Sequence, residues 1–135
     1  MTIIKNICLL ILIAIFSCSK KDVLECPDNI ACTEVFVSIG VKIVNSNNEI
    51  VNCFKTVTEI EGQVNPIVNN IFDIAVGPYI ILDDSQKSKL KKDGSKVIFT
   101  AYNEKDQVIA AENFVIGHDC CHVVKISGPE SITVK

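Results

Sequence analysis

Seven cysteines in 135 residues constrain this chain more than any other feature of its sequence. They are Cys8, Cys18, Cys26, Cys32, Cys53, Cys120 and Cys121. In an oxidising compartment such cysteines pair into disulfides, whereas in the cytoplasm they bind metals or act as reactive thiols. The role of the cysteines therefore depends on where the chain is delivered, and the N-terminus carries that information.

The N-terminus has the anatomy of an export signal. A short polar stretch containing Lys5 precedes an unbroken apolar segment of ten residues, Ile7 to Phe16, and the sequence turns polar at Ser17. A helix needs roughly 20 residues to span a bilayer, so a cleaved signal is favoured over a permanent membrane span. We therefore predict that residues 1–17 are removed as a signal peptide.

The end of the apolar run resembles the lipobox of bacterial lipoproteins. In "IFSC", Ile15 lies three residues before Cys18 and a small serine stands directly before it. In that family this cysteine carries a diacylglyceryl group and an acylated amine, so the resemblance implies that Cys18 is the lipidated start of the mature chain. Each buried methylene contributes about 0.8 kcal/mol, which makes such an anchor firm. The next residues, "SKKD", resemble the export signal of Bacteroidetes lipoproteins and imply an outer-membrane location, on the periplasmic face or at the cell surface.

The composition argues against several kinds of partner. Beyond residue 17 the chain has 12 lysines, no arginine and 16 acidic residues, a net charge of −4. Nucleic-acid binders need a basic face and usually use arginine, so no nucleic acid is expected. The chain has no tryptophan and only two tyrosines, which leaves few aromatic anchors for carbohydrate or protein ligands.

Alternating apolar residues predict an all-β domain over residues 32–135, joined to the anchor by a lipidated tether over residues 18–31. The first strand is indicated by apolar residues at every second position: Val35, Val37, Ile39, Val41 and Ile43. The polar run "NSNN" at 45–48 predicts a turn into a partner strand at 49–59, and hence a first hairpin. Pro66 restricts the following segment to a loop or an edge strand.

The second half predicts further short strands and one helix. The segments "IFDIAV" and "YIILDD" flank a break at Gly77 and Pro78, while "KVIFTAYN" and "QVIAAENFVI" flank a polar turn and predict a second hairpin. A short helix near 85–93 is expected to be capped by Asp84 or Ser85 and ended by Gly94. Its lysines are interleaved with aspartates, which favours a solvated face over an anion-binding patch. The fold prediction is a seven- to eight-stranded antiparallel β-sandwich with this one helix.

This order of segments resembles a known group of proteins. "YIILDDSQ", "VIFTAY" and above all "GHDCCHV" after a "FVI" strand are similar to segments of small uncharacterised Bacteroidetes envelope lipoproteins. Those proteins have an immunoglobulin-like or transthyretin-like (carboxypeptidase regulatory-like) β-sandwich. The resemblance implies a fold and a location, but no activity.

The segment "GHDCCH" holds both histidines and two adjacent cysteines. If it continues as a strand, His118, Cys120 and His122 face one side, and such a set suits zinc or copper. An oxidising compartment instead favours disulfides. The leading prediction is two bridges that tie Cys26 and Cys32 to Cys120 and Cys121, with a pairing that the sequence does not decide; a metal site is the alternative.

The remaining predictions concern Cys53 and function. Besides Cys8 in the signal and the lipidated Cys18, five cysteines remain, so one is left over, and Cys53 in mid-strand is predicted to be the free thiol. The chain has no nucleophile elbow, phosphate loop or "HExxH", so we expect neither catalysis nor a cofactor. The predicted function is a lipid-anchored binding or structural module for an envelope protein partner. The alternative is a metal-binding or thiol-active envelope protein that uses "GHDCCH".

Overall fold

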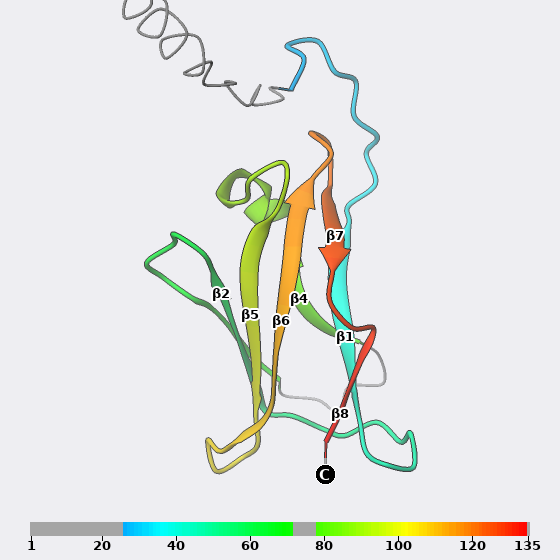
Figure 1. The fold of residues 1–135 in the computed structure, drawn as a ribbon, viewed down its shortest axis with the longest axis vertical. Helices are drawn as coiled ribbons and strands as arrows, with labels where there is room; N and C mark the ends of the chain where they lie inside the picture. The colour runs from blue at the N-terminus through cyan, green and yellow to red at the C-terminus, as the bar shows by residue number, and fades with distance from the viewer. Residues whose placement is uncertain (1–25, 72–77, 135) are drawn as a thin grey trace, which may run out of the picture.

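The computed structural model describes residues 26–71 and 78–134, which form a two-layered all-β domain (Figure 1). The elements are β1 (Ser38–Val44), β2 (Lys55–Ile60), β3 (Ile67–Asn70), β4 (Tyr79–Asp83), the 3₁₀ helix η1 (Asp84–Lys89), β5 (Ser95–Tyr102), β6 (Val108–His118), β7 (Val123–Ser127) and β8 (Ser131–Thr133). The predicted signal peptide, Cys18 and most of "IFDIAV" lie outside the described residues. Within these residues, no helix has the length and apolar character needed to cross a membrane.

Two sheets make the sandwich, one with the strand order β4-β1-β8 and one with the order β3-β2-β5-β6-β7. The prediction of an all-β sandwich with one short helix is confirmed. One strand pair departs from the antiparallel pattern, because β1 and β8 run parallel with Lys42 opposite Ser131. β7 belongs to the larger sheet and β8 to the smaller one, so the chain crosses between the sheets before β8. The direction of β8 is set by this crossing, because no hairpin joins β8 to β1.

Apolar side chains from alternate strand positions fill the space between the sheets. Ile39, Val41 and Ile43 of β1 are buried as the period-2 pattern predicts, and Phe99 and Phe114 of the larger sheet meet them from the other layer. The predicted strand starts too early, however, because Val35 is 65% exposed and β1 begins only at Ser38.

The first predicted hairpin is wrong. After the turn at 45–48, a single bridge joins Val44 to Ile50, and the chain then crosses to the other sheet, where β2 pairs with β3 and β5. The Tyr79 hydroxyl fixes this crossing, since it donates to Val51 O at 2.9 Å and accepts from Cys53 N at 3.1 Å. Alternation in 49–59 correctly indicates a strand with one buried face, but it does not say against which sheet that face packs.

The helix is shorter than predicted and has a different cap. It ends at Lys89, and Asp83 is the N-cap, with its carboxylate accepting from Ser85 N at 2.9 Å while Gln86 closes a capping box. Buried Leu90 follows in extended conformation, so Gly94 lies beyond the helix, in a turn at φ 113°. Asp84 does not cap the helix because its carboxylate is bound elsewhere, as described below.

The second predicted hairpin is confirmed. β5 and β6 pair antiparallel along most of their length, and the Asn103 side chain accepts hydrogen bonds from Lys105 N and Gln107 N in the turn between them. The segment after Pro66 forms β3, an edge strand of the larger sheet. These elements follow from local sequence, since turn chemistry and strand period both lie within a few residues.

Candidate functional site

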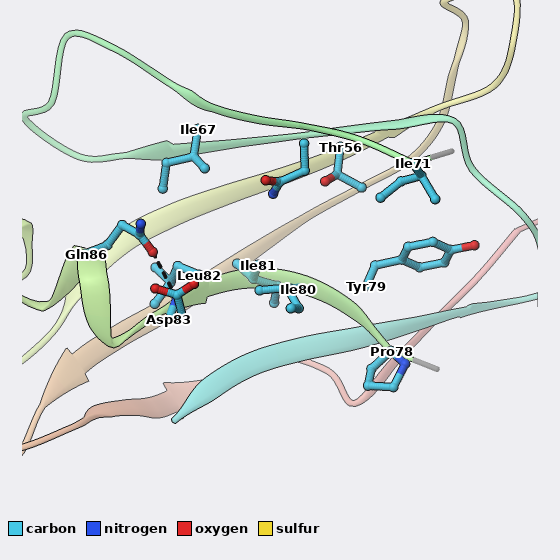
Figure 2. A pocket seen from close by; sticks show the side chains of 11 residues that line it. Thr56, Ile67, Ile71, Pro78, Tyr79, Ile80, Ile81, Leu82, Asp83 and Gln86 are labelled. Carbon is cyan, nitrogen blue, oxygen red and sulfur yellow. Dashed lines mark hydrogen bonds between the residues drawn. The ribbon is translucent and has the colours of Figure 1, made fainter. Parts of the chain in front are cut away.

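A cavity of about 370 Å³ opens between the edge strands β3 and β4. Figure 2 shows Ile67, Thr56 and Ile71 on one side of it and Pro78 to Asp83 on the other. Thr58 Oγ1 donates to Ile81 O at 2.8 Å and holds β4 close to β2 on the inner side. In the sequence, Pro66 was the one signal for an edge at β3, and no residue pattern marked the cavity.

The cysteine pair lies in a turn and not in a strand. β6 ends at His118 and β7 begins at Val123, and Cys120 has a positive φ of 84°. Asp119 stabilises the turn, because its Oδ1 accepts from Cys121 N at 2.9 Å and from His122 N at 2.7 Å. The strand premise of the metal hypothesis is therefore wrong.

Two disulfides join this turn to the N-terminal segment. The pairs are Cys26–Cys120 and Cys32–Cys121, 94 and 89 residues apart in sequence. The prediction of disulfides is confirmed, and the structure supplies the pairing. Cys53 is the free cysteine within the described residues; it is buried, and this burial raises the pKa of its thiol.

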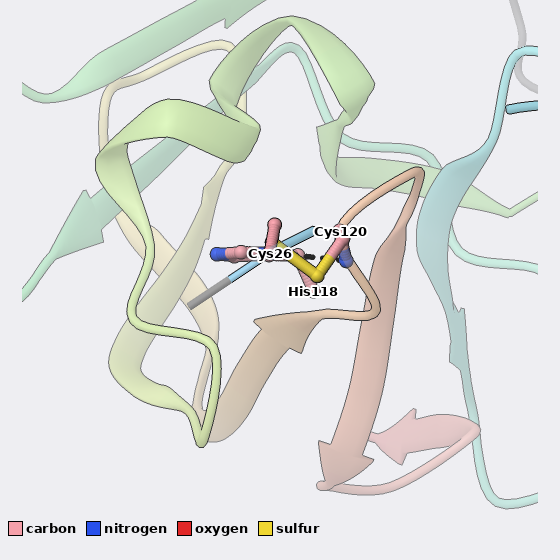
Figure 3. A group of neighbouring side chains, drawn as sticks. All are labelled: Cys26, His118 and Cys120. Carbon is pink, nitrogen blue, oxygen red and sulfur yellow. Dashed lines mark hydrogen bonds between the residues drawn. A yellow bond between two sulfur atoms is a disulfide. The ribbon is translucent and has the colours of Figure 1, made fainter. Parts of the chain in front are cut away.

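His118 lies beside the first disulfide. One ligand atom each from Cys26, His118 and Cys120 falls within 4.8 Å of the others (Figure 3). Burial, and then the ammonium groups of Lys87 and Lys92, lower the pKa of His118, so its imidazole is neutral at pH 7. The two sulfurs are bonded to each other, and a disulfide offers no thiolate to a metal.

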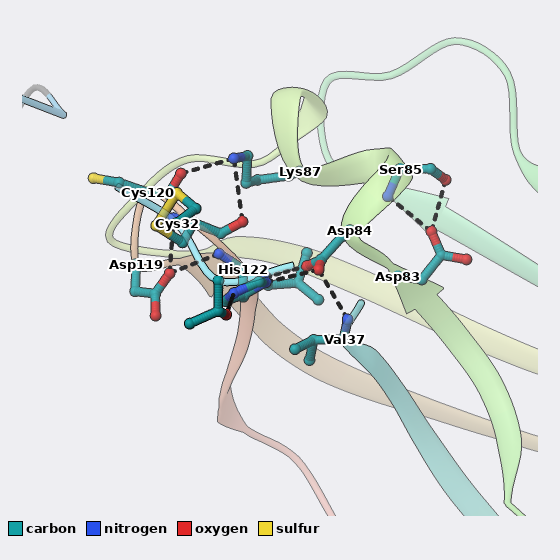
Figure 4. Close-up of polar contacts among 12 residues, drawn as sticks. Cys32, Val37, Asp83, Asp84, Ser85, Lys87, Asp119, Cys120 and His122 are labelled. Atoms are coloured by element: carbon teal, nitrogen blue, oxygen red, sulfur yellow. Dashed lines mark hydrogen bonds and ion pairs between the residues drawn. A yellow bond between two sulfur atoms is a disulfide. The ribbon is translucent and has the colours of Figure 1, made fainter. Parts of the chain in front are cut away.

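His122 belongs to a different group of contacts, centred on Asp84 (Figure 4). The Asp84 carboxylate accepts from Val37 N and Val123 N, each at 2.8 Å, and lies 2.8 Å from His122 Nδ1. Burial by itself would raise the pKa of Asp84, but these hydrogen bonds outweigh burial and hold the pKa at about 2. One carboxylate thus links the helix start, the N-terminal segment and β7.

The other ring nitrogen of His122 contacts the N-terminal segment. Its Nε2 lies 2.9 Å from Thr33 Oγ1, so Thr33, His122 and Asp84 have the connectivity of a hydroxyl–histidine–carboxylate triad. Thr33 is exposed, and neither it nor His122 borders the cavity at β3 and β4. These contacts attach the segment around Thr33 to the turn at 119–122, which the disulfides also hold.

Helix η1 also contacts the disulfide-bonded turn. Lys87 Nζ donates to Cys120 O at 2.7 Å and to Cys121 O at 3.2 Å, so the helix holds the turn through its carbonyl groups. The motif "GHDCCH" indicated the cysteines and histidines of this end, but no sequence pattern indicated Thr33, Asp84 and Lys87 as their partners. The two partners of each contact are separated by between 33 and 89 positions in the sequence, so no local pattern marks them.

No family model, curated protein or solved structure matches this chain. The likeness to Bacteroidetes envelope lipoproteins therefore remains a prediction from sequence. The candidate sites are the cavity between β3 and β4 and the disulfide-bearing end, hereafter the stapled end, which comprises residues 26–37, η1 and the turn at 119–122.

Proposed function

We propose that this chain is a lipid-anchored module of the outer membrane that binds an extended segment of an envelope protein between β3 and β4, and that it is not an enzyme. The observation that carries the proposal is the cavity lying between two sheet edges. Among the described residues, each edge strand has a neighbour on one side only, so its outer backbone groups are open to an added strand.

The side chains around the cavity favour a peptide with apolar residues. Ile67, Ile71, Pro78 and Ile80 are among the lining residues, and Ile80 is 47% exposed. An extended peptide places every second side chain on the same face, so its backbone can pair with an edge while alternate side chains enter the cavity. A volume of about 370 Å³ is within the usual range of ligand sites, about 300–1,000 Å³.

A photocrosslinker tests the binding site in cells. Benzophenone at position 80 is compared with benzophenone at position 98, because Ile98 has a similar exposure, 42%, but lies on the central strand β5. We expect a discrete crosslinked envelope protein from position 80 only. A synthetic peptide of the crosslinked segment is then expected to bind the purified protein, to lose binding with Ile80→Lys and to keep it with Ile98→Lys. Equal crosslinking at both positions would refute the site.

The lipid anchor has its own test. The mature protein isolated from membranes is expected to begin at Cys18 and to carry the mass of its acyl chains. Cys18→Ser is expected to abolish acylation and membrane retention. Mature protein that stays in the membrane fraction without acyl mass would contradict the anchor and leave the peptide-binding proposal to its separate test.

The grouping of Cys26, His118 and Cys120 favours a second candidate function, a metal site in the reduced protein. A dithiol reductant would convert the disulfide into two thiols, and their thiolates with one imidazole are ligands that zinc accepts. Native mass spectrometry with zinc before and after reduction tests it. Stoichiometric zinc that disappears with His118→Ala, but not with His122→Ala, would support this candidate.

A further inference from the structure

We propose that the stapled end faces the membrane and that lysines around η1 bind its anionic lipid headgroups. This inference rests on the anchor at Cys18 in the proposed function. It concerns lysines that do not line the cavity of the peptide-binding proposal, and it arises from where the disulfides attach the chain and from where these lysines lie.

The first disulfide makes the connection to the anchor short. Cys26 is eight residues after Cys18, and an extended chain spans at most about 3.5 Å per residue, so about 28 Å separates them at full extension. Without the disulfides, the next side-chain contact of the segment is at Thr33, which an extended chain could place about 50 Å from Cys18. Thr33 contacts the same turn through His122, so both attachments hold the same end of the sandwich, and the Cys26–Cys120 bond shortens the tether between that end and the bilayer.

A cluster of lysines lies at the same end, on η1 and just after it, although the stapled end also carries Asp28, Glu34, Asp84 and Asp119. The carboxylates of Asp84 and Asp119 are occupied by hydrogen bonds to His122 and to backbone N–H groups. Of the nine lysines in the described residues, five lie within ten residues: Lys87, Lys89, Lys91, Lys92 and Lys96. Asp93 is the only acidic residue among these ten, although the whole chain has a net charge of −3. The aspartates near these lysines favour a solvated face when the sequence is taken alone, but five lysines against one aspartate within ten residues are locally complementary to an anionic surface.

The structure places two of these lysines, Lys87 and Lys92, beside the disulfide-bonded turn or the end of β6 that leads into it. Lys87 contacts Cys120 O and Cys121 O, as described above, and Gly117 allows the chain at Lys92 to approach the end of β6, where an added Cβ would lie 2.6 Å from Lys92 O. Figure 1 shows η1 at the end of the sandwich where the N-terminal segment enters. The hairpin turn with Glu104 and Asp106 lies at the opposite end.

Three of the five lysines are free to bind headgroups. Lys87 is held by backbone carbonyls and Lys91 pairs with Glu61 at 3.3 Å. Within the part of the chain that the structure describes, Lys89, Lys92 and Lys96 form no ion pair, and Lys89 and Lys96 are exposed. Asp28 and Glu34 are exposed residues of the N-terminal segment, which is bonded to the start of η1 through Val37 and Asp84, whereas Lys89, Lys92 and Lys96 follow at the end of the helix and beyond it.

Vesicle flotation tests the proposal with the full chain, acylated and unacylated. The unacylated protein is expected to float with vesicles containing phosphatidylglycerol and not with phosphatidylcholine alone, and to be released by raised salt. One lysine near such a surface contributes a factor of about five in affinity. The triple variant Lys89→Gln, Lys92→Gln, Lys96→Gln is thus expected to bind about a hundredfold more weakly. The charge-matched control is Lys42→Gln, Lys105→Gln, Lys125→Gln, which is expected to bind as the parent does.

Amine labelling of the acylated protein then reports orientation. Lys89, Lys92 and Lys96 are expected to be protected on anionic vesicles and accessible on neutral ones, while Lys105 stays accessible on both. Equal loss of binding in the control variant, or equal labelling on both vesicles, would overturn the membrane-facing surface. Flotation of the acylated protein on neutral vesicles tests the anchor alone, so failure of the anchor is distinguishable from failure of the lysine surface.

Discussion

The two ends of this sandwich are held by different interactions. At the stapled end, residues 26–37 bury little apolar surface, since Val35 and Phe36 are 65% and 64% exposed, and two disulfides and the Asp84 contacts fasten them. At the other end, the crossing segment at 51–53 packs against the core and is fixed by the Tyr79 hydroxyl. A segment that cannot be held by apolar burial is thus held by covalent and polar bonds, which respond to redox conditions and pH.

Loss of the two disulfides is expected to lower the free energy of unfolding more than any other change considered. A bridge closing about 90 residues stabilises by about 4 kcal/mol in the chain-entropy model, and the second, whose loop overlaps the first over nearly its whole length, adds less. Urea unfolding of the reduced protein measures the loss, with Cys53→Ala as the thiol control under oxidising conditions. Hydrogen exchange is expected to show residues 26–37 exposed first while β5 and β6 remain protected. Simultaneous loss of protection in β5 would contradict the division between the two ends.

Tyr79→Phe tests the opposite end. It removes a hydroxyl that serves both Val51 O and Cys53 N, and leaving such groups unpaired costs about 1–3 kcal/mol. Chemical denaturation measures the change. Tyr102→Phe is the matched control and is expected to change stability by less than about 0.5 kcal/mol. If both variants behave alike, the Tyr79 hydroxyl is not what fixes the crossing.

Acid is expected to weaken the stapled end selectively. The pKa of Asp84 is lowered from 3.8 to about 2 in the folded protein, so its contribution is present above about pH 4 and is lost as the pH falls through 2. Asp84→Asn is expected to lower stability at neutral pH and to flatten this acid dependence, whereas Asp83→Asn, which affects only the helix cap, leaves it in place. Thermal unfolding between pH 2 and 5 measures both, and an unchanged profile in Asp84→Asn would contradict the role of the carboxylate.

The smallest expected effect concerns His118. Its folded pKa lies below the ordinary value of 6.5 because of burial, then Lys87 and Lys92, so the unfolded chain binds its proton first. Stability is therefore complete above pH 6.5 and decreases as the pH falls toward the folded pKa. NMR titration of the imidazole measures that pKa, and Lys92→Gln is expected to raise it, while Lys105→Gln leaves it unchanged. A pKa at or above 6.5 in the parent would contradict this account.

Local sequence was sufficient for several features. The period-2 patterns predict β1 from Ile39 onward and the β5–β6 hairpin, and the turn at Asn103 follows from residues in immediate succession. Counting cysteines in a chain predicted to be exported left one unpaired, and the choice of Cys53 is confirmed, although Cys53 lies in the crossing segment before β2 and not in mid-strand as predicted. Export itself, Cys18 acylation and the envelope location stay predictions.

Only the tertiary structure decided which elements meet. It assigns β2 to the larger sheet, pairs Cys26 with Cys120 and Cys32 with Cys121, and brings Asp84 to His122 across 38 residues. The physical reason is that alternation shows that a face is buried without showing what covers it, and that a cysteine or carboxylate accepts any suitable partner that packing brings within reach. Sequence determined the elements and their chemistry; packing of the two sheets determined their partners.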